Sequence, residues 1–209
     1  AGLIVAAPVA AGVGSDRLSA ASEHPRVAVR SSPWAALRRP LRIPSIPGGD
    51  TCPRTVGGRD APRVAVTIGR GPVFPVLGMP AAPPDPRGVV SIHGERRGRW
   101  GAYHKTLWAS APEASGRVLV RGRRVDGHGE IRFQVARERP RRELPLAAAT
   151  GKRSRWRYFP TASVVPRSGC WAFQIDGAKF SRVVVFRVVA HAVAASSRYR
   201  DPQASSGRV

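Results

Sequence analysis

The sequence predicts an all-β protein, and three observations lead to that fold class. Short runs of alternating or β-branched residues recur at regular intervals, turn-forming Gly and Pro are abundant at 22 and 20 residues, and no long stretch has helical periodicity. With 209 residues and 42% hydrophobic side chains, the chain is long enough to bury a core. We therefore expect about seven to nine strands, arranged as a sandwich or a barrel.

Residues 1–50 lack sustained periodicity and are interrupted by prolines, which fix φ and cannot donate a backbone hydrogen bond. The apolar residues 3–13 resemble the core of a signal peptide in length and composition, so residues 1–15 are interpreted as the remnant of an export signal or as an irregular mature end. Trp34 and Leu37 either dock on the domain or belong to a mobile tail. Residues 1–50 are thus expected to be a mostly irregular, proline-rich lead-in.

The β-like segments follow one another from residue 51 to residue 190. They lie at residues 63–69, 71–78, 88–94, 99–110, 116–127, 129–136, 154–165 and 169–189. Residues 137–155 are polar, basic and irregular, and predict a long loop. Residues 191–209 are small and polar, which is typical of a disordered tail.

The last hairpin has the strongest strand signal. In GCWAFQIDG, alternation places Trp171, Phe173 and Ile175 on one face, which we expect to be the core face. Asp176-Gly177 indicates the hairpin turn, because both residues tolerate positive φ. The returning strand, residues 179–189, is rich in Val and Phe on both faces, which predicts a central strand covered on both sides.

Cys52 and Cys170 are the two cysteines of the chain. In an exported protein, two distant cysteines predict a disulfide that joins the incoming chain to the last hairpin. In a cytosolic protein they would remain free thiols. A nucleophilic role for Cys170 lacks a local base or oxyanion signature.

Several of these segments resemble a group of exported bacterial proteins, often described as lipoproteins, for which no activity is established. The resemblance spans residues 37–189 and is carried by GPVFPVLG, KTLWAS, GRVLVRGRRVDGHGEIRF and VPRSGCWAFQIDGAKFSRVVVFRV. It implies export and a single Ig-like antiparallel β-sandwich over residues 51–190. The function it favours is a non-catalytic binding or scaffolding module of the cell envelope or the extracellular space.

The net charge of +22 points to anionic partners, or it reflects GC-rich codon usage, which also enriches Ala, Gly and Pro. The candidate anion-binding residues lie in and after the long loop, which is either a binding loop or a solvated charge run. They are Arg137, Arg139, Arg141, Arg142, Lys152, Arg153, Arg155 and Arg157. An anionic envelope polymer is the expected partner, and a basic nucleic-acid-binding protein is the alternative.

Enzymatic chemistry has few candidates, and an unrecognised hydrolase ranks third among the function classes. The residues that could bind a metal are His93, Glu95, His104, Asp126, His128 and Glu130, most of them in Gly-rich turns. Zinc sites need three or four ligands from converging elements, and this spacing does not indicate convergence. We therefore expect no enzyme activity, no cofactor, no metal and no transmembrane span, and the oligomeric state stays open.

Overall fold

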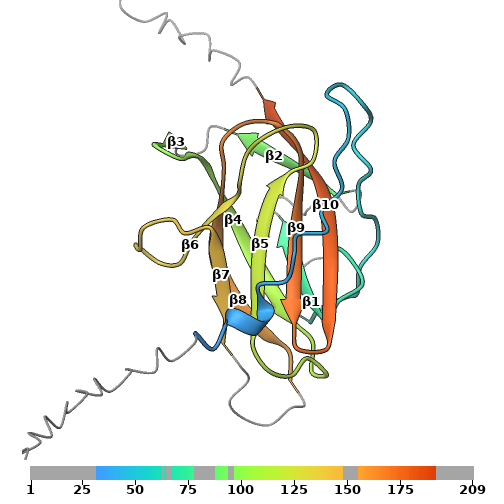
Figure 1. Cartoon of the computed structure of the whole chain (residues 1–209), viewed down its shortest axis with the longest axis vertical. Helices are drawn as coiled ribbons and strands as arrows, with labels where there is room; N and C mark the ends of the chain where they lie inside the picture. The colour runs from blue at the N-terminus through green and yellow to red at the C-terminus, as the bar shows by residue number, and fades with distance from the viewer. Residues whose placement is uncertain are drawn as a thin grey trace, which may run out of the picture. The chain divides into compact units, whose positions relative to one another are not determined.

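Two β-sheets pack face to face in the computed structural model (Figure 1). The structure describes residues 32–62, 64, 67–77, 88–93, 97–147 and 155–191, excluding the side chains of residues 92, 93, 97, 190 and 191. The signal-peptide interpretation and the predicted C-terminal tail therefore fall outside the described residues. The nearly complete absence of helix among those residues confirms the all-β prediction, and the two layers form a β-sandwich.

The first sheet has the strand order β1-β4-β8-β6, with β3 paired to β4. Its strands are β1 (Val73–Leu77), β3 (Arg97–Gly98), β4 (Gly101–Ser110), β6 (Arg132–Gln134) and β8 (Arg157–Val165). The second sheet has the order β2-β10-β9-β5-β7. Its strands are β2 (Val89–His93), β5 (Val118–Arg124), β7 (Glu143–Leu146), β9 (Gly169–Gly177) and β10 (Phe180–His191).

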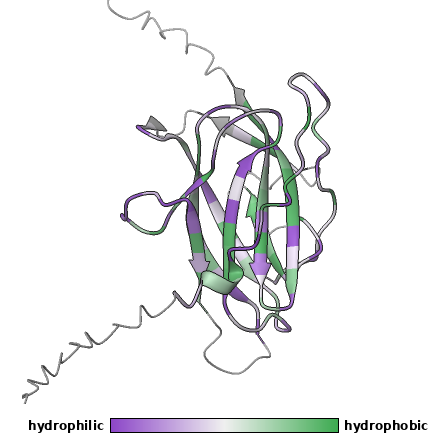
Figure 2. Cartoon of the chain, in the orientation of Figure 1, coloured by the Kyte–Doolittle hydropathy of each residue, from purple (hydrophilic) through white to green (hydrophobic). Residues whose placement is uncertain are grey.

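The core between the sheets is built around aromatic side chains. Phe173 lies at its centre, with ring centroids 5.0 Å from Trp108 and 4.6 Å from Phe186. Trp171 and Ile175 lie on the same face of β9 and are fully buried, as the alternation in this strand predicts. Figure 2 shows hydrophobic residues concentrated along the strands of both sheets.

One strand pair departs from the antiparallel arrangement. β10 pairs with β2 in parallel, with Arg187 opposite Val89, whereas its other neighbour β9 is antiparallel. Parallel pairs need a long crossover, and seven other strands lie between β2 and β10 in the sequence, so the sequence spacing alone did not reveal the pairing. The second sheet is therefore mixed.

The turn of the last hairpin differs from the prediction. Gly177 pairs with Phe180, so the two turn residues are Ala178 and Lys179, not Asp176-Gly177. Asp176 is fully buried and accepts a hydrogen bond from Ser181, which keeps it within the strand. Gly177 allows the Phe180 ring to pack closely against the backbone, because a Cβ at residue 177 would lie 2.3 Å from Cε1 of Phe180.

Two further differences concern short segments. β7 lies within residues 137–155, which the sequence predicts as a loop, and its Leu144 and Leu146 are buried. Within the predicted strand 63–69, the described residues 64 and 67–69 belong to no strand. The Thr67 hydroxyl bonds instead to the backbone of Arg59, which ties this segment to the preceding loop.

Replacement of Trp171 tests the core. We expect Trp171→Ala to lower the free energy of unfolding by about 3–5 kcal/mol, because a fully buried ring leaves a cavity. Trp171→Phe should cost less, about 1 kcal/mol for the hydrogen bond that Nε1 donates to the Arg167 carbonyl, plus a small packing loss. Denaturant unfolding of both variants measures this. Equal losses for the two would contradict the assignment of Trp171 as a packing residue.

Candidate anion-binding surface

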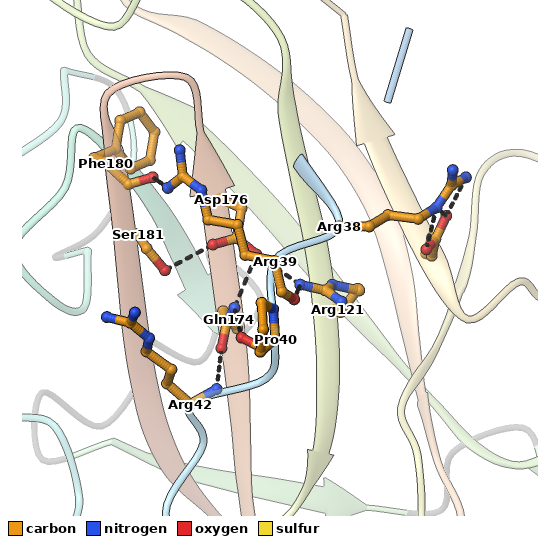
Figure 3. Close-up of polar contacts among 10 residues, drawn as sticks. Arg38, Arg39, Pro40, Arg42, Arg121, Gln174, Asp176, Phe180 and Ser181 are labelled. Carbon is orange, nitrogen blue, oxygen red and sulfur yellow. Dashed lines mark hydrogen bonds and ion pairs between the residues drawn. The ribbon is translucent and has the colours of Figure 1, made fainter. Parts of the chain in front are cut away.

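Residues 38–46, here called the strap, cross the outer face of β9 and β5 (Figures 1 and 3). The strap bonds to side chains of the sheet. The Arg42 backbone N–H donates to Gln174 Oε1 at 2.6 Å, and Gln174 Nε2 donates to the Pro40 carbonyl at 3.1 Å. On β5, Arg123 donates to the Ile43 carbonyl at 2.5 Å. Side chains of the sheet therefore hold a proline-rich segment that cannot form a regular ladder with it.

Asp176 organises the polar contacts beneath the strap (Figure 3). Its carboxylate is fully buried and accepts hydrogen bonds from Arg121 at 2.9 Å, Gln174 at 2.9 Å and Ser181 at 2.6 Å. Arg121 also donates to the Arg39 carbonyl of the strap. A buried carboxylate is tolerated only when it is paired and hydrogen-bonded, so these contacts couple the strap to the sheet.

The disulfide expected between Cys52 and Cys170 is present, with a Cα–Cα distance of 5.5 Å. It lies in a small apolar cluster on the outer face of the sheet, with Ile43, Val125 and Ala172. The crosslink joins the chain that follows the strap to the start of β9. Cys170 therefore has a structural role, because its sulfur forms the disulfide with Cys52.

A cleft of about 530 Å³ opens beside the strap. The cleft is lined by Leu41 and Ser45 of the strap, residues 121–124 of β5, the turn at residues 127–130, Arg142 and Glu143. Four arginines and two glutamates line the cleft. Both glutamates are already paired, Glu130 with Arg142 at 2.8 Å and Glu143 with Arg38 at 2.9 Å.

Arg123 differs from its neighbours in this cleft. The charge of Arg121 is neutralised by Asp176, and that of Arg124 by Asp126. Within the described part of the chain, Arg123 forms no ion pair; one Nη donates to the Ile43 carbonyl, and its buried Nε has no partner. Arg123 is thus a guanidinium that is held in place by the strap without being neutralised by a carboxylate.

The predicted basic residues are dispersed. Arg142 lines the cleft, Arg141 pairs with Glu138 at 3.0 Å, and Arg139 lies 6.0 Å from the ring centroid of Trp100. Arg157 is half-buried and donates to the Ser110 hydroxyl and the Ala114 carbonyl. Arg137 and Arg155 are exposed, and Lys152 and Arg153 lie outside the described residues. The structure therefore does not gather the six described residues of this set into one surface.

The candidate metal ligands are also scattered. His104 is buried in β4, Asp126 bonds to Arg124 and to the Cys170 N–H, and His128 and Glu130 line the cleft. The His93 side chain and Glu95 lie outside what the structure describes. Among the described residues, no three His, Cys, Asp or Glu side chains form a group that could hold a metal ion.

Sequence reasoning did not single out Arg123, Arg99 or Arg132 as site residues. Alternation along β5 places Arg121 and Arg123 on one face, but it does not reveal that the strap covers that face. Arg99 and Arg132 gather with Arg139 around Trp100. In the sequence, the stretch RGRW at residues 97–100 places Arg99 beside Trp100, but it does not show that Arg132 and Arg139 lie near them.

No protein-family model, curated protein or solved structure matches this chain. The resemblance to exported bacterial proteins and its Ig-like implication therefore stay predictions. In the described residues, no helix has the length and apolarity needed to span a membrane. Function must be inferred from the fold and from the chemistry of its surface.

Loss of the disulfide should destabilise the fold. The bond spans a sequence separation of 118, for which loop-closure entropy gives about 4–5 kcal/mol of stability. We expect the double variant Cys52→Ser/Cys170→Ser to lose roughly that free energy of unfolding in denaturant titrations, and reduced wild type to behave like it. Intact mass after alkylation, with and without prior reduction, provides the control. Two thiols that alkylate without reduction would disprove the crosslink.

Acid should weaken the contact at Asp126. Burial alone would raise the pKa of its carboxyl, but hydrogen bonds from Arg124 and from the Cys170 N–H outweigh burial and hold that pKa below its usual range. The ionised form therefore stabilises the fold above the ordinary carboxyl pKa of about 4, and this stability is lost as pH falls through the lower folded-state value.

Asp126→Asn should accordingly destabilise the protein near neutral pH, with the difference from wild type shrinking below about pH 4. Arg124→Gln should move the acid loss to higher pH, because it removes the main group that favours the carboxylate. Urea unfolding between pH 7 and pH 2.5 tests both variants. A difference between Asp126→Asn and wild type that is independent of pH would contradict the assignment.

Proposed function

We propose that this protein is a non-catalytic, exported β-sandwich module that binds an anionic polymer of the cell envelope. Two properties support the proposal. A disulfide persists in oxidising compartments, which favours a location outside the cytosol. The chain also carries 35 basic residues against 13 acidic ones, so that its surface attracts polyanions.

The observation that carries the proposal is Arg123 in the cleft. Its guanidinium is fixed by the strap and lacks a carboxylate partner among the described residues. A planar guanidinium pairs strongly with carboxylate or phosphate groups, and prior fixation lowers the entropy lost on binding. An anionic group that enters the cleft would thus supply the missing partner.

The acidic residues of the cleft permit this binding. Glu130 pairs with Arg142 and Glu143 with Arg38, and all four side chains are partly exposed. Such exposed ion pairs contribute little stability, so an incoming anion can compete for Arg142 at low cost. Arginine stays protonated and only donates hydrogen bonds, so the arginines of the cleft suit the binding of an anion.

The alternative is a basic nucleic-acid-binding protein. The charge of +22 favours it, as does the grouping of arginines around Trp100. A dedicated nucleic-acid binder would keep tight binding at physiological salt and would carry reduced thiols. The envelope module instead binds weakly, with a steep dependence on salt.

Binding of the full-length protein to polyphosphate, polygalacturonate and a dT20 oligonucleotide tests the proposal. We expect Arg123→Gln to weaken binding of an anionic polymer about tenfold, since charge-assisted hydrogen bonds contribute about 1.5–3 kcal/mol. The matched control is Arg70→Gln, which removes the same charge from an exposed turn.

Isothermal titration calorimetry at several salt concentrations measures the losses. If Arg123→Gln lowers the binding affinity no more than Arg70→Gln does, the cleft is not the binding site. No binding of wild type to any of the polymers would overturn the proposed function itself. Salt-resistant binding of dT20 alone, by protein with free thiols, would favour the nucleic-acid alternative.

A further inference from the structure

Trp100 is surrounded by three arginines from three separate segments. The guanidinium carbons of Arg132, Arg99 and Arg139 lie 4.1, 4.9 and 6.0 Å from its ring centroid. Each distance falls within the range of cation–π attraction. We call Trp100 and these three residues the Trp100 cluster.

Backbone geometry brings the cluster together. Gly98 pairs with Gly101, so Arg99 and Trp100 form the two-residue turn between β3 and β4. Gly101 has a φ of 130°, and its Cβ would clash with the Val165 carbonyl, so this turn requires glycine. The tip of the hairpin is therefore set by the pairing of short strands and by a glycine.

The other two arginines come from β6 and the loop that follows it. Arg132 lies opposite Val164 in the ladder between β6 and β8. After β6, Ala136 adopts a φ of 50°, and Phe133 bridges to Arg141, which returns the loop toward the sheet. This loop carries Arg139. Two of the three guanidiniums thus stand on or beside paired strands and not on long free loops.

The cluster concentrates positive charge that no carboxylate among the described residues neutralises. In the described residues, none of Arg99, Arg132 and Arg139 takes part in an ion pair, and Glu138 of the same loop is engaged by Arg141. The negative face of the indole ring offsets part of the mutual repulsion. The positive charge of the three guanidiniums can therefore attract an anion.

Stacking also decides which atoms the cluster presents. A guanidinium that lies over a ring uses its face, and its N–H donors point outward in its own plane. Arg132, at 4.1 Å, covers part of the ring that a nucleic-acid base would need for stacking. The cluster is therefore suited to binding anionic groups and not to stacking against nucleic-acid bases.

The number of guanidiniums favours phosphate over carboxylate. A carboxylate has two oxygens in one plane and matches the fork of a single arginine. A phosphate group presents several acceptor oxygens in a tetrahedral arrangement, so two or three arginines can bind it together. We infer that the Trp100 cluster binds phosphate groups of a polymer, with Trp100 as the platform that orients the arginines. This inference rests on the proposed function and names its ligand chemistry.

The test compares linear polyanions on the full-length protein. Polyphosphate supplies phosphates without bases, polygalacturonate supplies carboxylates, and dT20 supplies phosphates with bases. We expect polyphosphate to bind more tightly than polygalacturonate, and dT20 to gain nothing from its bases. Arg132→Gln should weaken polyphosphate binding about tenfold and lower the slope of log affinity against log salt by about 1.

Two further variants separate orientation from charge. Trp100→Leu leaves the charge unchanged but removes the platform, so it should weaken polyphosphate binding several-fold, whereas Trp100→Phe should retain most of it. Arg132→Lys preserves the charge without the planar fork and should recover the salt slope without recovering the affinity. Arg70→Gln again measures the effect of a charge alone, and thermal unfolding confirms that each variant folds.

The outcomes distinguish this inference from the proposed function. Polyphosphate binding that Arg132→Gln and Arg70→Gln weaken equally would overturn the cluster and leave the proposed function standing. Preference for polygalacturonate would overturn the phosphate assignment, and so would dT20 binding that exceeds polyphosphate binding and is lost in Trp100→Leu. Failure of wild type to bind every polymer would remove the proposed function and this inference together.

Discussion

The buried carboxylate of Asp176 constrains the whole second sheet. Asp176 and Gln174 lie on the outer face of β9, where a sandwich strand usually meets water, yet both are fully buried. A charge in that position needs hydrogen bonds from every side, and Arg121, Gln174 and Ser181 supply them. Gln174 and Arg121 also bond to the strap, so the groups that satisfy this carboxylate also hold the incoming chain across the sheet.

The strap that covers the outer face also helps to form the cleft that contains Arg123. The strap, β5 and the turn at residues 127–130 all line this cleft. The arginines of β5 consequently divide into two kinds. Arg121 neutralises a buried carboxylate, whereas Arg123 bonds to a carbonyl and forms no ion pair among the described residues. β5 therefore provides a structural arginine, Arg121, and the arginine on which the proposed binding depends, Arg123.

Local periodicity was enough to predict the core face of β9, because a two-residue repeat reports which side chains share a face. The prediction for β10 was only partly met: the strand has a neighbour on each side, but β9 is the middle strand of the sheet and Arg187 of β10 is exposed. Periodicity was not enough for features that depend on distant partners. The Asp176-Gly177 turn prediction was wrong because contacts with Arg121 and Ser181 hold Asp176 inside the strand. β7 was missed because a short strand containing a proline resembles a loop until its buried leucines find a sheet. The strap and Arg123 were missed for the same reason: their contacts lie far apart in sequence.

Net charge alone is a poor guide to function in this protein. Many of its arginines are occupied: Arg38, Arg121, Arg124 and Arg142 pair with carboxylates, and Arg157 bonds to a hydroxyl and a carbonyl. An arginine that is already paired adds little to the attraction of a ligand, and an exposed, unrestrained one adds attraction without selectivity. Selectivity requires guanidiniums that are both uncompensated and held in place. Judged by the described residues, Arg123 under the strap and Arg132 over Trp100 meet both conditions, which makes their geometry a better indicator of the ligand than the total of +22.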